Sequence, residues 1–553
     1  MSYLKSAPTR RRTPQTTPLP GQVKNSAGGG VWAVTPLTRL RRFLILGSEG
    51  GSYYASERDL TAENVSCLAE CDPIEAVKLI AEVSYEGLAT RNDQALYALA
   101  YYAAHEDERV RRLALGHLSD VARTGTHLMQ FADFVQSQRG WGRALRRAVG
   151  DWYSHKPAGR VAYQAVKYRQ RHGFTHRDLL RLSHPEAPTD KHRILYDWIA
   201  HPGSRRDPDL PDRNLGDELR ILEGFERAQV SRDFKETARL IREYGLPHEA
   251  IMTEHKGSHE VWAALLESMP ATALVRNLPT MTRVGLIEPM SDGTQTVLGK
   301  LSDHDWLCRS RVHPFQVLVA ALTYGSGRSL RGSSTWTPVM QVLDALDAAF
   351  YGTFAGVEPT GKRTLLALDV SGSMGSPCIM GVPGLSPYVA SAAMALVTAS
   401  TEPRHEILAF TEKGMSQRMT RFRGYHQRAA AFTPVPISPK QRLGDVVAVL
   451  QQMGFGMGGT DCALPWVYAR EQGREVDVAV TYTDSETWAG DTHPTQELDR
   501  YRRETGVDAR AVVCAMVANE FSIADPNDPR QLDVVGFDAS APRVIADFSA
   551  GRL

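Results

Sequence analysis

The sequence is poor in cysteine, and its few cysteines lack the spacing of a metal site. Six cysteines are spread over 553 residues, and no C-x-x-C pair of the kind that binds zinc is present. Cys67 and Cys71 are four residues apart, which fits one face of a helix. Scattered cysteines favour buried free thiols over disulfides, and therefore a protein that works in a reducing compartment.

Long apolar runs are also missing. No stretch approaches the roughly 20 apolar residues that a membrane-spanning helix needs. Residues 1–20 are rich in Thr, Pro and Arg, and no apolar core follows their basic residues as it would in a secretory signal. They are expected to form a flexible arm, whose Arg10, Arg11 and Arg12 either touch an acidic partner or are solvated. We therefore expect a cytoplasmic protein that contacts no membrane.

The chain has no excess of either charge. Lys and Arg total 64 while Asp and Glu total 63, so the formal net charge is +1. A nearly neutral chain argues neither for nor against a nucleic-acid partner, and the local distribution of charge must decide. The length exceeds that of one ordinary domain, so we expect two units.

Signatures of the common enzyme classes do not occur. His248-Glu249 is followed by a histidine only at His255, which is not the spacing of a helical zinc protease site. The glycine-containing stretch from Gly325 to Arg328 lacks the lysine of a phosphate-binding loop, and no G-x-S-x-G elbow is present. We therefore expect no enzyme activity and assign no catalytic residues.

Oxygen-bearing side chains follow a short apolar run between Thr364 and Met374, which reads TLLALDVSGSM. The run suits a strand buried on both faces, and it ends at Asp369. Ser371 and Ser373 follow at every second position. Three short oxygen side chains on one tight turn form a site for a hard cation, although D-x-S-x-S alone is equally typical of a plain turn.

Two later stretches supply further oxygen atoms. Gly458 to Asp461 reads GGTD and offers the hydroxyl of Thr460. A second apolar run, VDVAVTY, is followed by Thr483 and Asp484. Ligands collect outside the carboxyl ends of strands in open α/β sheets, so we expect these loops to meet. A ligand set made only of oxygen atoms favours Mg²⁺ or Mn²⁺ over zinc.

This three-part signature resembles the metal-ion-dependent adhesion site of the von Willebrand factor A domain. The resemblance implies that Ser371, Ser373 and Thr460 are hydroxyl ligands, and that Asp369 and Asp484 act directly or through water. It also implies an α/β doubly wound fold over residues 360–553. Apolar patterning agrees independently, because it predicts helices and strands over Tyr388–Ser400 (helix), His405–Phe410 (strand), Leu443–Met453 (helix) and Ala509–Met516 (strand).

Between Leu60 and about Gly352, apolar residues recur at the spacing of helices. The predicted helices are Ala76–Glu86, Gln94–Ala104, Arg109–Thr124, Met129–Gln136, Ala144–Tyr153, Glu218–Glu226, Asp233–Glu243, Glu260–Glu267, Pro314–Thr323 and Trp336–Phe350. Helices in such number without strands suggest an α-solenoid of helix pairs, with an irregular bundle as the alternative. The concave side of a solenoid usually binds a partner. Before this region, the glycine-rich stretch Gly21–Trp32 is predicted to be a loop, one suited to close approach to a ligand.

Positive charge is densest between Arg139 and His184. In this stretch, 11 Lys and Arg face only Asp151 and Asp178, which is the footprint of a polyanion partner. Aromatic residues interleaved with the charge suit stacking on unpaired bases. The alternative, a solvated helical face with aromatics in the core, is weighed equally on the charge alone.

The spacing within this basic stretch makes local predictions. Tyr163, Lys167 and Arg171 are four residues apart, so they are expected to share one helix face. A glycine follows at residue 173 and can end that helix. Thr175 with Asp178 forms a capping pattern for the next helix.

Five long stretches carry a family resemblance: GQVKNSAGGGVW (Gly21–Trp32), RRFLILGSEGGSYY (Arg41–Tyr54), GWGRALRRAVGDWY (Gly140–Tyr153), KYRQRHGFTHRDLLRLSH (Lys167–His184) and EPTGKRTLLALDVSGSM (Glu358–Met374). They resemble the Ro autoantigen (60 kDa Ro ribonucleoprotein) family, which joins a TROVE module to a von Willebrand factor A domain. The similarity extends over nearly all of the chain from about Thr17 onward. Pro377–Pro387, rich in Gly and Pro, resembles bacterial members more than animal ones.

The resemblance implies a TROVE RNA-binding domain of HEAT-like helical repeats over residues 21–355, which form a ring closed by the metal-site domain. Misfolded or unprocessed small non-coding RNAs would pass a single-stranded 3′ end through its hole for RNA quality control, and a Y RNA would bind the outer surface. The RNA contacts implied by that match are Lys167, Arg171 and His184, and we expect Arg177 and Arg181 to contact phosphates with them. A monomeric ribonucleoprotein with an exoribonuclease partner, such as polynucleotide phosphorylase, would follow.

Two alternatives remain open. One is a protein-adhesion module, in which an acidic residue of a partner completes the shell of the metal. The other is a metal-dependent nuclease, which the absence of a second acidic cluster beside the metal loop disfavours.

Overall fold

The computed structural model describes residues 12–47, 57–89, 91–203, 216–310, 312–329, 332–352, 354, 357–375, 379, 385–412, 432–435, 438, 440–442, 444–446, 459–536, 538 and 540–553. The chain divides into two compact units, one made of Met1–Cys67 with Phe354–Leu553, and the other of Leu68–Thr353. Within the described residues, no helix is long and apolar enough to cross a membrane.

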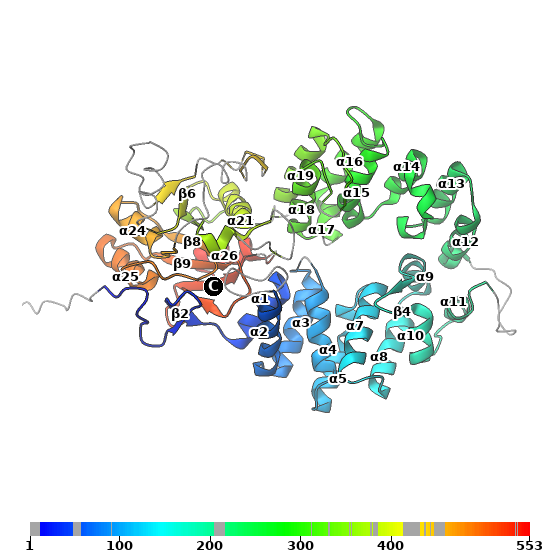
Figure 1. Ribbon diagram of the computed structural model, residues 1–553, viewed down its shortest axis with the longest axis horizontal. Helices are drawn as coiled ribbons and strands as arrows, with labels where there is room; N and C mark the ends of the chain where they lie inside the picture. The colour runs from blue at the N-terminus through cyan, green and yellow to red at the C-terminus, as the bar shows by residue number, and fades with distance from the viewer. Residues whose placement is uncertain are drawn as a thin grey trace, which may run out of the picture. The chain divides into compact units, whose positions relative to one another are not determined.

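The unit spanning Leu68–Thr353 is almost entirely helical (Figure 1). Its helices are α3 (Pro73–Glu86), α4 (Asp93–Ala103), α5 (Glu108–Gly116), α6 (Leu118–Val121), α7 (Gly125–Gln138), α8 (Arg143–Ser154), α9 (Ala158–Lys167), α10 (His176–Ser183), α11 (Asp190–Ala200), α12 (Gly216–Val230), α13 (Phe234–Tyr244), α14 (His259–Ser268), α15 (Ala271–Arg283), α16 (Asp292–Ser302), α17 (His304–Arg309), α18 (Pro314–Gly325) and α19 (Met340–Gly352). Two short 3₁₀ helices, η1 (His248–Ala250) and η2 (Thr253–Gly257), precede α14.

Neighbouring helices of this unit pack in pairs, among them α4 with α7, α13 with α14, and α18 with α19. Their starts follow the sequence signals: Asp72 caps α3 with its side chain, and Pro314 occupies the first turn of α18. The Nε2 atom of His313 lies 2.8 Å from the carbonyl oxygen of Leu88. This contact joins the residue before α18 to the segment after α3, so the first and last parts of the helical array meet.

Three sequence predictions for this unit need correction. The helix predicted over Arg109–Thr124 is two helices, α5 and α6, with the break at His117. The helix predicted from Trp336 begins at Met340. The predicted absence of strands is wrong as well, because β3 (Gln170–Arg171) and β4 (Phe174–Thr175) form an antiparallel hairpin.

The other unit is built on a six-stranded sheet in the order β11-β9-β8-β5-β6-β7. The strands are β5 (Thr364–Asp369), β6 (His405–Phe410), β7 (Phe432–Pro434), β8 (Val478–Thr483), β9 (Arg510–Ala515) and β11 (Gln531–Val535). All neighbouring strands are parallel except β7, which runs antiparallel to β6. The chain winds outward in both directions from β5 and β8, so the topological switch point lies between these two strands.

Helices flank this sheet (Figure 1). They are α20 (Gly372–Gly375), α21 (Pro387–Thr401), α24 (Leu464–Glu471), α25 (Pro494–Thr505) and α26 (Ala541–Ser549). Trp466 of α24 and Tyr501 of α25 share a buried cluster with Leu365 and Leu408 of the sheet. Helix α21 packs on β5 and β8, and α26 packs on β11. The helix predicted over Leu443–Met453 lies largely outside the described residues.

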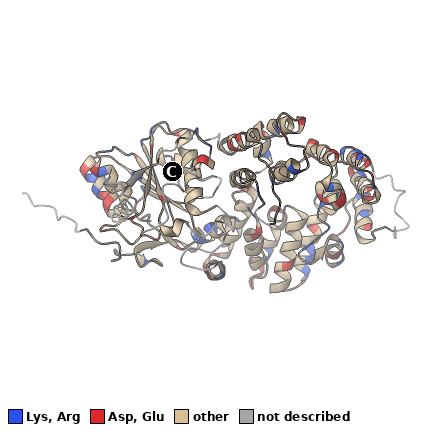
Figure 2. Ribbon diagram, turned by 45° about the horizontal axis from the view of Figure 1, so that its top comes forward, with Lys and Arg blue, Asp and Glu red and all other residues tan. Residues whose placement is uncertain are grey.

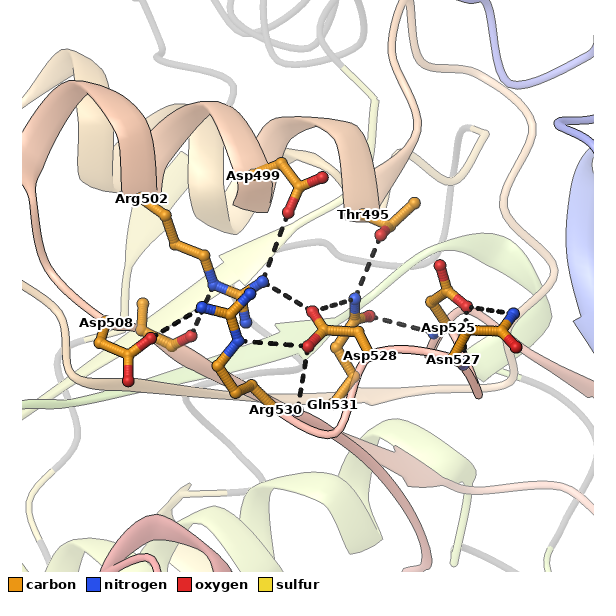
Figure 3. A network of polar contacts seen from close by, with 10 residues as sticks. Thr495, Asp499, Arg502, Asp508, Asp525, Asn527, Asp528, Arg530 and Gln531 are labelled. Carbon is orange, nitrogen blue, oxygen red and sulfur yellow. Dashed lines mark hydrogen bonds and ion pairs between the residues drawn. The ribbon is translucent and has the colours of Figure 1, made fainter.

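An arginine network fixes α25 to the loop before β11 (Figure 3). The Nη1 atom of Arg502 donates to Oδ2 of Asp528 at 2.6 Å, and Nε of Arg530 donates to its Oδ1 at 3.2 Å. Burial alone would raise the pKa of the Asp528 carboxyl, but the hydrogen bonds from Arg502 and its neighbours outweigh burial and hold that pKa well below its usual range. The ionised Asp528 carboxylate therefore joins α25 to the loop before β11.

The N-terminal residues belong to this α/β unit. Strands β1 (Val23–Lys24) and β2 (Gly30–Ala33) form a hairpin, and β2 also pairs with β10 (Phe521–Ser522). Helices α1 (Pro36–Leu46) and α2 (Glu57–Glu70) follow. The stretch Gly21–Trp32, which was predicted to be a loop throughout, therefore forms a hairpin, with β1 near its start and β2 at its end. Residues 12–20, assigned from sequence to a flexible arm, include the fully buried Gln15.

The prediction that the cysteines are buried free thiols holds for four of the five described cysteines. The described cysteines are all free, and Cys67, Cys71, Cys462 and Cys514 are buried. Cys308 is exposed instead. Cys378 lies outside the described residues.

Candidate functional site

Three segments of the α/β unit meet at the carboxyl edge of the sheet. Asp369 is the last residue of β5, and Asp484 directly follows β8, the neighbouring parallel strand. Both aspartates therefore lie at the same edge, at the switch point of the sheet. Ser371 and Ser373 follow Asp369, and the loop of Thr460 is bonded to the loop that follows Asp484. Each of the five residues is at most 4% exposed. Gly458, which precedes this threonine loop, lies outside the described residues.

Hydrogen bonds fix the first of these segments. The Oδ1 atom of Asp369 accepts from the Ser371 backbone N–H at 3.0 Å, and its Oδ2 atom accepts from the Thr483 hydroxyl at 2.6 Å. The hydroxyls of Ser371 and Ser373 lie 3.1 Å apart, and the Ser373 hydroxyl also bonds the Asp484 carboxyl. Four of the predicted ligands thus form one connected group.

The threonine loop is tied to the loop after β8. The carbonyl oxygen of Thr460 accepts the backbone N–H groups of Trp488 and Ala489, each at 2.9 Å. The Oδ1 atom of Asp484 accepts from the Glu486 backbone N–H at 3.0 Å. Sequence reasoning did not single out Thr483, although its place directly before Asp484 at a strand end was an available signal.

Burial sets the electrostatics of this group. Desolvation, with the nearby Asp484 charge as the second cause, raises the pKa of Asp369 to about 7. Burial also raises the pKa of Asp484. Among the described residues, no Lys, Arg or His forms an ion pair with either carboxyl. Two adjacent buried carboxylates without a basic partner, lined by hydroxyl oxygens, fit a hard divalent cation, whose charge would offset the cost of ionising both.

The site differs from a cluster of strong ligands. Within the part of the chain that the structure describes, no three His, Cys, Asp or Glu residues gather closely enough to hold a metal ion. The group at the sheet edge has only two acidic side chains, and its other predicted donors are neutral hydroxyls. Its composition therefore suits Mg²⁺ or Mn²⁺ rather than zinc.

The predicted RNA contacts lie in the helical unit, and four of the five are exposed. Arg171 is on β3, Arg177 and Arg181 are on α10, and His184 ends α10 with φ of 47°. Lys167 is different, because its side chain is 15% exposed and its Nζ lies 3.7 Å from Oε1 of Glu249. Lys167 is thus largely satisfied within the protein.

The local structure corrects one prediction and confirms another. Helix α9 ends at Lys167, and Arg171 lies in the β3–β4 hairpin, so the two do not share a helix face. The hairpin turns at His172 and Gly173, whose φ values of 48° and 76° are those that a tight primed turn needs. Thr175 and Asp178 form the predicted capping box, with both reciprocal bonds present.

Exposed arginines extend from α8 to α10, two helices that pack on each other. They are Arg143, Arg146, Arg147, Arg177 and Arg181, and we call this set the arginine surface. Figure 2 marks the Lys and Arg residues of these elements in blue. Among the described residues, none of the five pairs with a carboxylate, in contrast to Arg239 and Arg242 on α13, which pair with Glu243 and Glu267. The arginine surface is therefore open to an anionic partner.

The aromatics of the basic stretch lie mostly in the core. Trp152 and Tyr153 are fully buried, and Phe174 is 9% exposed. The Trp152 indole N–H donates to the carbonyl oxygen of Ala122 at 2.6 Å. Trp141, Tyr163 and Tyr168 are only half-buried. Base stacking by this stretch would therefore fall to these three residues.

Fold and site together define the class of protein: helix pairs in a closed array, joined to a doubly wound α/β domain with a carboxylate–hydroxyl group at its switch point. Residues 363–549 match the family model described as the Ro60 vWA domain, and residues 23–206 and 247–325 match the TROVE domain.

The chain is similar over its length to proteins named RNA-binding protein RO60. It is 39% identical to one from Deinococcus radiodurans over 537 residues, which cover 96% of each chain. It is 32% identical to one from Caenorhabditis elegans over an alignment of 607 residues, gaps included, with 96% of this chain and 91% of the relative covered. The crystal structure of the Deinococcus radiodurans RO (RSR) protein matches with a TM-score of 0.64 and 35% identity, over 94% of this chain and all of that one. The chain therefore belongs to the RO60 family.

These matches confirm the family and the fold class expected from the sequence. Both relatives carry the name of an RNA-binding protein, not of an enzyme.

Proposed function

We propose that this protein is an RNA-binding scaffold of a ribonucleoprotein, and that the arginine surface with the adjacent β3–β4 hairpin holds the phosphates of the RNA. The main support for this proposal is the set of exposed arginines on α8 and α10, which pair with no carboxylate among the described residues. Their charge is not neutralised within the fold, so a polyanion gains from binding there. The names of the relatives support the same partner.

Contacts of this kind position an RNA without reading its sequence. A scaffold that relies on them accepts many RNAs, as one acting on misfolded or unprocessed small non-coding RNAs must. We therefore propose RNA quality control as the role, with single-stranded 3′ ends and a Y RNA as ligands and an exoribonuclease such as polynucleotide phosphorylase as the protein partner. The protein would act as a monomer in the cytoplasm.

Fluorescence anisotropy with a labelled small RNA tests the RNA surface. The double variant Arg177→Ala/Arg181→Ala should weaken binding at least tenfold, because two phosphate contacts are lost. The matched control is Arg239→Ala/Arg242→Ala, which removes the same charge from α13, where both arginines are ion-paired. Equal weakening by both pairs would show that only net charge matters and would remove the assigned surface.

A second comparison tests the preference for free 3′ ends. An RNA with a single-stranded 3′ overhang should bind more tightly than the same RNA with a fully paired end, since unpaired nucleotides offer bases and a flexible backbone to the protein. Equal affinities would remove the role of the 3′ end and leave phosphate binding intact.

We also propose that Asp369, Ser371, Ser373, Thr460 and Asp484 bind Mg²⁺ or Mn²⁺. The two buried carboxylates and the raised pKa of Asp369, to about 7, support a cation there. When bound, the cation would supply a positive centre that an acidic side chain of a protein partner can complete. Trp488 is 38% exposed, and its backbone N–H bonds the Thr460 carbonyl, so an aromatic side chain is available to such a partner.

Titration with Mn²⁺, followed by electron paramagnetic resonance, tests this site. The wild-type chain should bind one ion with modest affinity, and Asp369→Asn should abolish binding while leaving the circular dichroism spectrum unchanged. Undiminished binding by Asp369→Asn would place the ion elsewhere.

A further inference from the structure

The N-terminal segment 12–33 holds the two loops that carry Thr460 and Asp484. Gln15 is fully buried, and its Nε2 donates to Oδ1 of Asp461 at 2.8 Å and to the Thr492 carbonyl at 2.9 Å. Its Oε1 accepts from the Thr487 hydroxyl at 2.5 Å. One side chain thus bridges the residue after Thr460 to the loop after β8.

Asn25 holds the same loop from another side. Its Nδ2 donates to the carbonyl oxygens of Ser485 and Thr487 at 3.1 and 3.0 Å, and its Oδ1 accepts from the Gly29 N–H at 2.7 Å. Next to it, the Ala27 N–H donates to Oε2 of Glu486 at 3.1 Å. The loop that begins at Asp484 is therefore bonded through three successive residues, 485–487.

The backbone of the segment lies against this loop. A Cβ atom added to Gly29 would be 1.7 Å from the Thr487 carbonyl oxygen, so a side chain at this position cannot be accommodated. The segment is anchored beyond this point by the pairing of Trp32 in β2 with Ser522 in β10. The stretch was expected to approach a ligand closely, and it approaches the protein's own loop after β8 instead.

The loop after β8 needs such support. Ser485 has φ of 62°, a left-handed conformation that costs a non-glycine residue free energy unless its surroundings hold it. Asp369, Asp484 and Glu486 are all buried near it, each at most 4% exposed. The bonds from Gln15 and Asn25 hold the loop in this conformation.

We propose that Gln15 and Asn25 are positioning residues for the divalent cation: they hold the loops of Thr460 and Asp484 at the separation that a cation needs. Cation binding and docking of segment 12–33 then strengthen each other, because both stabilise the same closed loop. This inference rests on the proposed metal site and deepens it, since it assigns control of that site to residues more than 400 positions away in the sequence.

Mn²⁺ affinity of the full-length chain, measured by electron paramagnetic resonance, tests the assignment. Asn25→Ala and Gln15→Ala should each weaken Mn²⁺ binding roughly tenfold, since the first removes two and the second four hydrogen bonds to the loops of Thr460 and Asp484. Thr13→Ala is the matched control: it lies in the same segment but bonds Gln496 of α25, so it should leave Mn²⁺ affinity within twofold.

The two variants act on different bonds, so the test survives if one of them fails to fold. If wild-type protein binds no Mn²⁺, the proposed metal site fails and the positioning role fails with it. If wild-type protein binds Mn²⁺ and a folded Asn25→Ala or Gln15→Ala variant binds equally well, the positioning role alone is overturned.

Hydrogen–deuterium exchange supplies a readout independent of affinity. Reciprocity requires that Mg²⁺ slow amide exchange in residues 25–30 of the wild-type chain, where the Ala27 and Gly29 N–H groups are bonded. Asp369→Asn should abolish this protection. Unchanged exchange on addition of saturating Mg²⁺ to wild-type protein would show that the segment and the cation are not coupled.

Discussion

Arg42 and Asp533 form an ion pair in which Nη2 of the arginine lies 2.7 Å from both carboxylate oxygens. The Arg42 side chain is 0% exposed, and its Nη1 donates to the carbonyl oxygens of Asn519 and Phe521. This one guanidinium joins α1 to β11 and to the residues around β10. The N-terminal helix is therefore an integral part of the α/β unit.

Replacing Arg42 with Met should destabilise the α/β unit by about 3–5 kcal/mol, because Asp533 loses its charged partner and two carbonyl oxygens lose a donor in a buried place. Chemical denaturation followed by circular dichroism measures the loss. Arg552→Ala, which removes an exposed pair with Asp547, is the control and should cost less than about 1 kcal/mol. A similar small loss for both variants would contradict the structural role given to Arg42.

Gly29→Ala should destabilise the same unit by several kcal/mol or displace segment 12–33, since the new methyl group would overlap the Thr487 carbonyl. Gly299→Ala, in the middle of α16 with nothing near its added Cβ, should stabilise the helical unit by about 0.5–1 kcal/mol. Differential scanning calorimetry compares the two. An unchanged melting profile for Gly29→Ala would refute the close approach.

The meeting of the Asp369 and Asp484 strand ends and most helices were predictable from sequence because their signals are local. Asp369, Ser371 and Ser373 lie within five residues, and strand ends on either side of a switch point meet by the rules of parallel sheets. The Thr175 capping box is likewise written in four consecutive residues.

Contacts between distant segments were not predictable in this way. Nothing in the sequence near Gln15 or Asn25 indicates which residues they bond. Gln15 bonds Asp461, which is 446 positions away, and Asn25 bonds residues 460 and 462 positions away. The hairpin at 170–175 was missed because helical spacing continues from Tyr163 through Lys167 to Arg171. The helix ends at Lys167, and the positive φ values at His172 and Gly173 belong to the hairpin turn, which apolar spacing does not indicate.

Buried histidines of the helical unit should make it less stable at acidic pH. Burial lowers the pKa of His176, and likewise of His127, from 6.5 to about 4. The unfolded chain therefore binds protons between pH 6.5 and 4 that the folded chain does not, so stability is complete above about pH 6.5 and falls as pH decreases toward 4. His176 alone would contribute a loss of up to about 3 kcal/mol.

Urea denaturation between pH 7 and 4.5 checks this dependence. His176→Gln, which keeps a polar group beside the Tyr153 hydroxyl, should flatten the decline, and the exposed His184→Gln should leave it unchanged. An equally steep decline in His176→Gln would show that other groups set the acid limit.

RNA binding should depend strongly on salt, because the proposed contacts are made to phosphates. About five contacts on a single strand predict that log affinity falls with log salt at a slope near −3 to −4, so a fourfold rise in salt should weaken binding on the order of 100-fold. The exposure of each side chain indicates how much it should contribute to that slope. Arg171 and Arg181 are exposed, whereas Lys167 is 15% exposed and pairs with Glu249.

Arg171→Ala/Arg181→Ala should therefore reduce the slope by about 1.4 and weaken all RNAs alike, since each lost phosphate contact removes about 0.7. Lys167→Ala should change the slope by less than half as much. Lys167 is already paired with Glu249 inside the protein, so a contact with a phosphate would have to replace that ion pair. Anisotropy titrations at four salt concentrations separate these outcomes. A flat salt response in the wild-type protein would remove the phosphate contacts, and a larger effect of Lys167 than of the arginine pair would show that RNA displaces Glu249 and binds deeper, between α9 and η1.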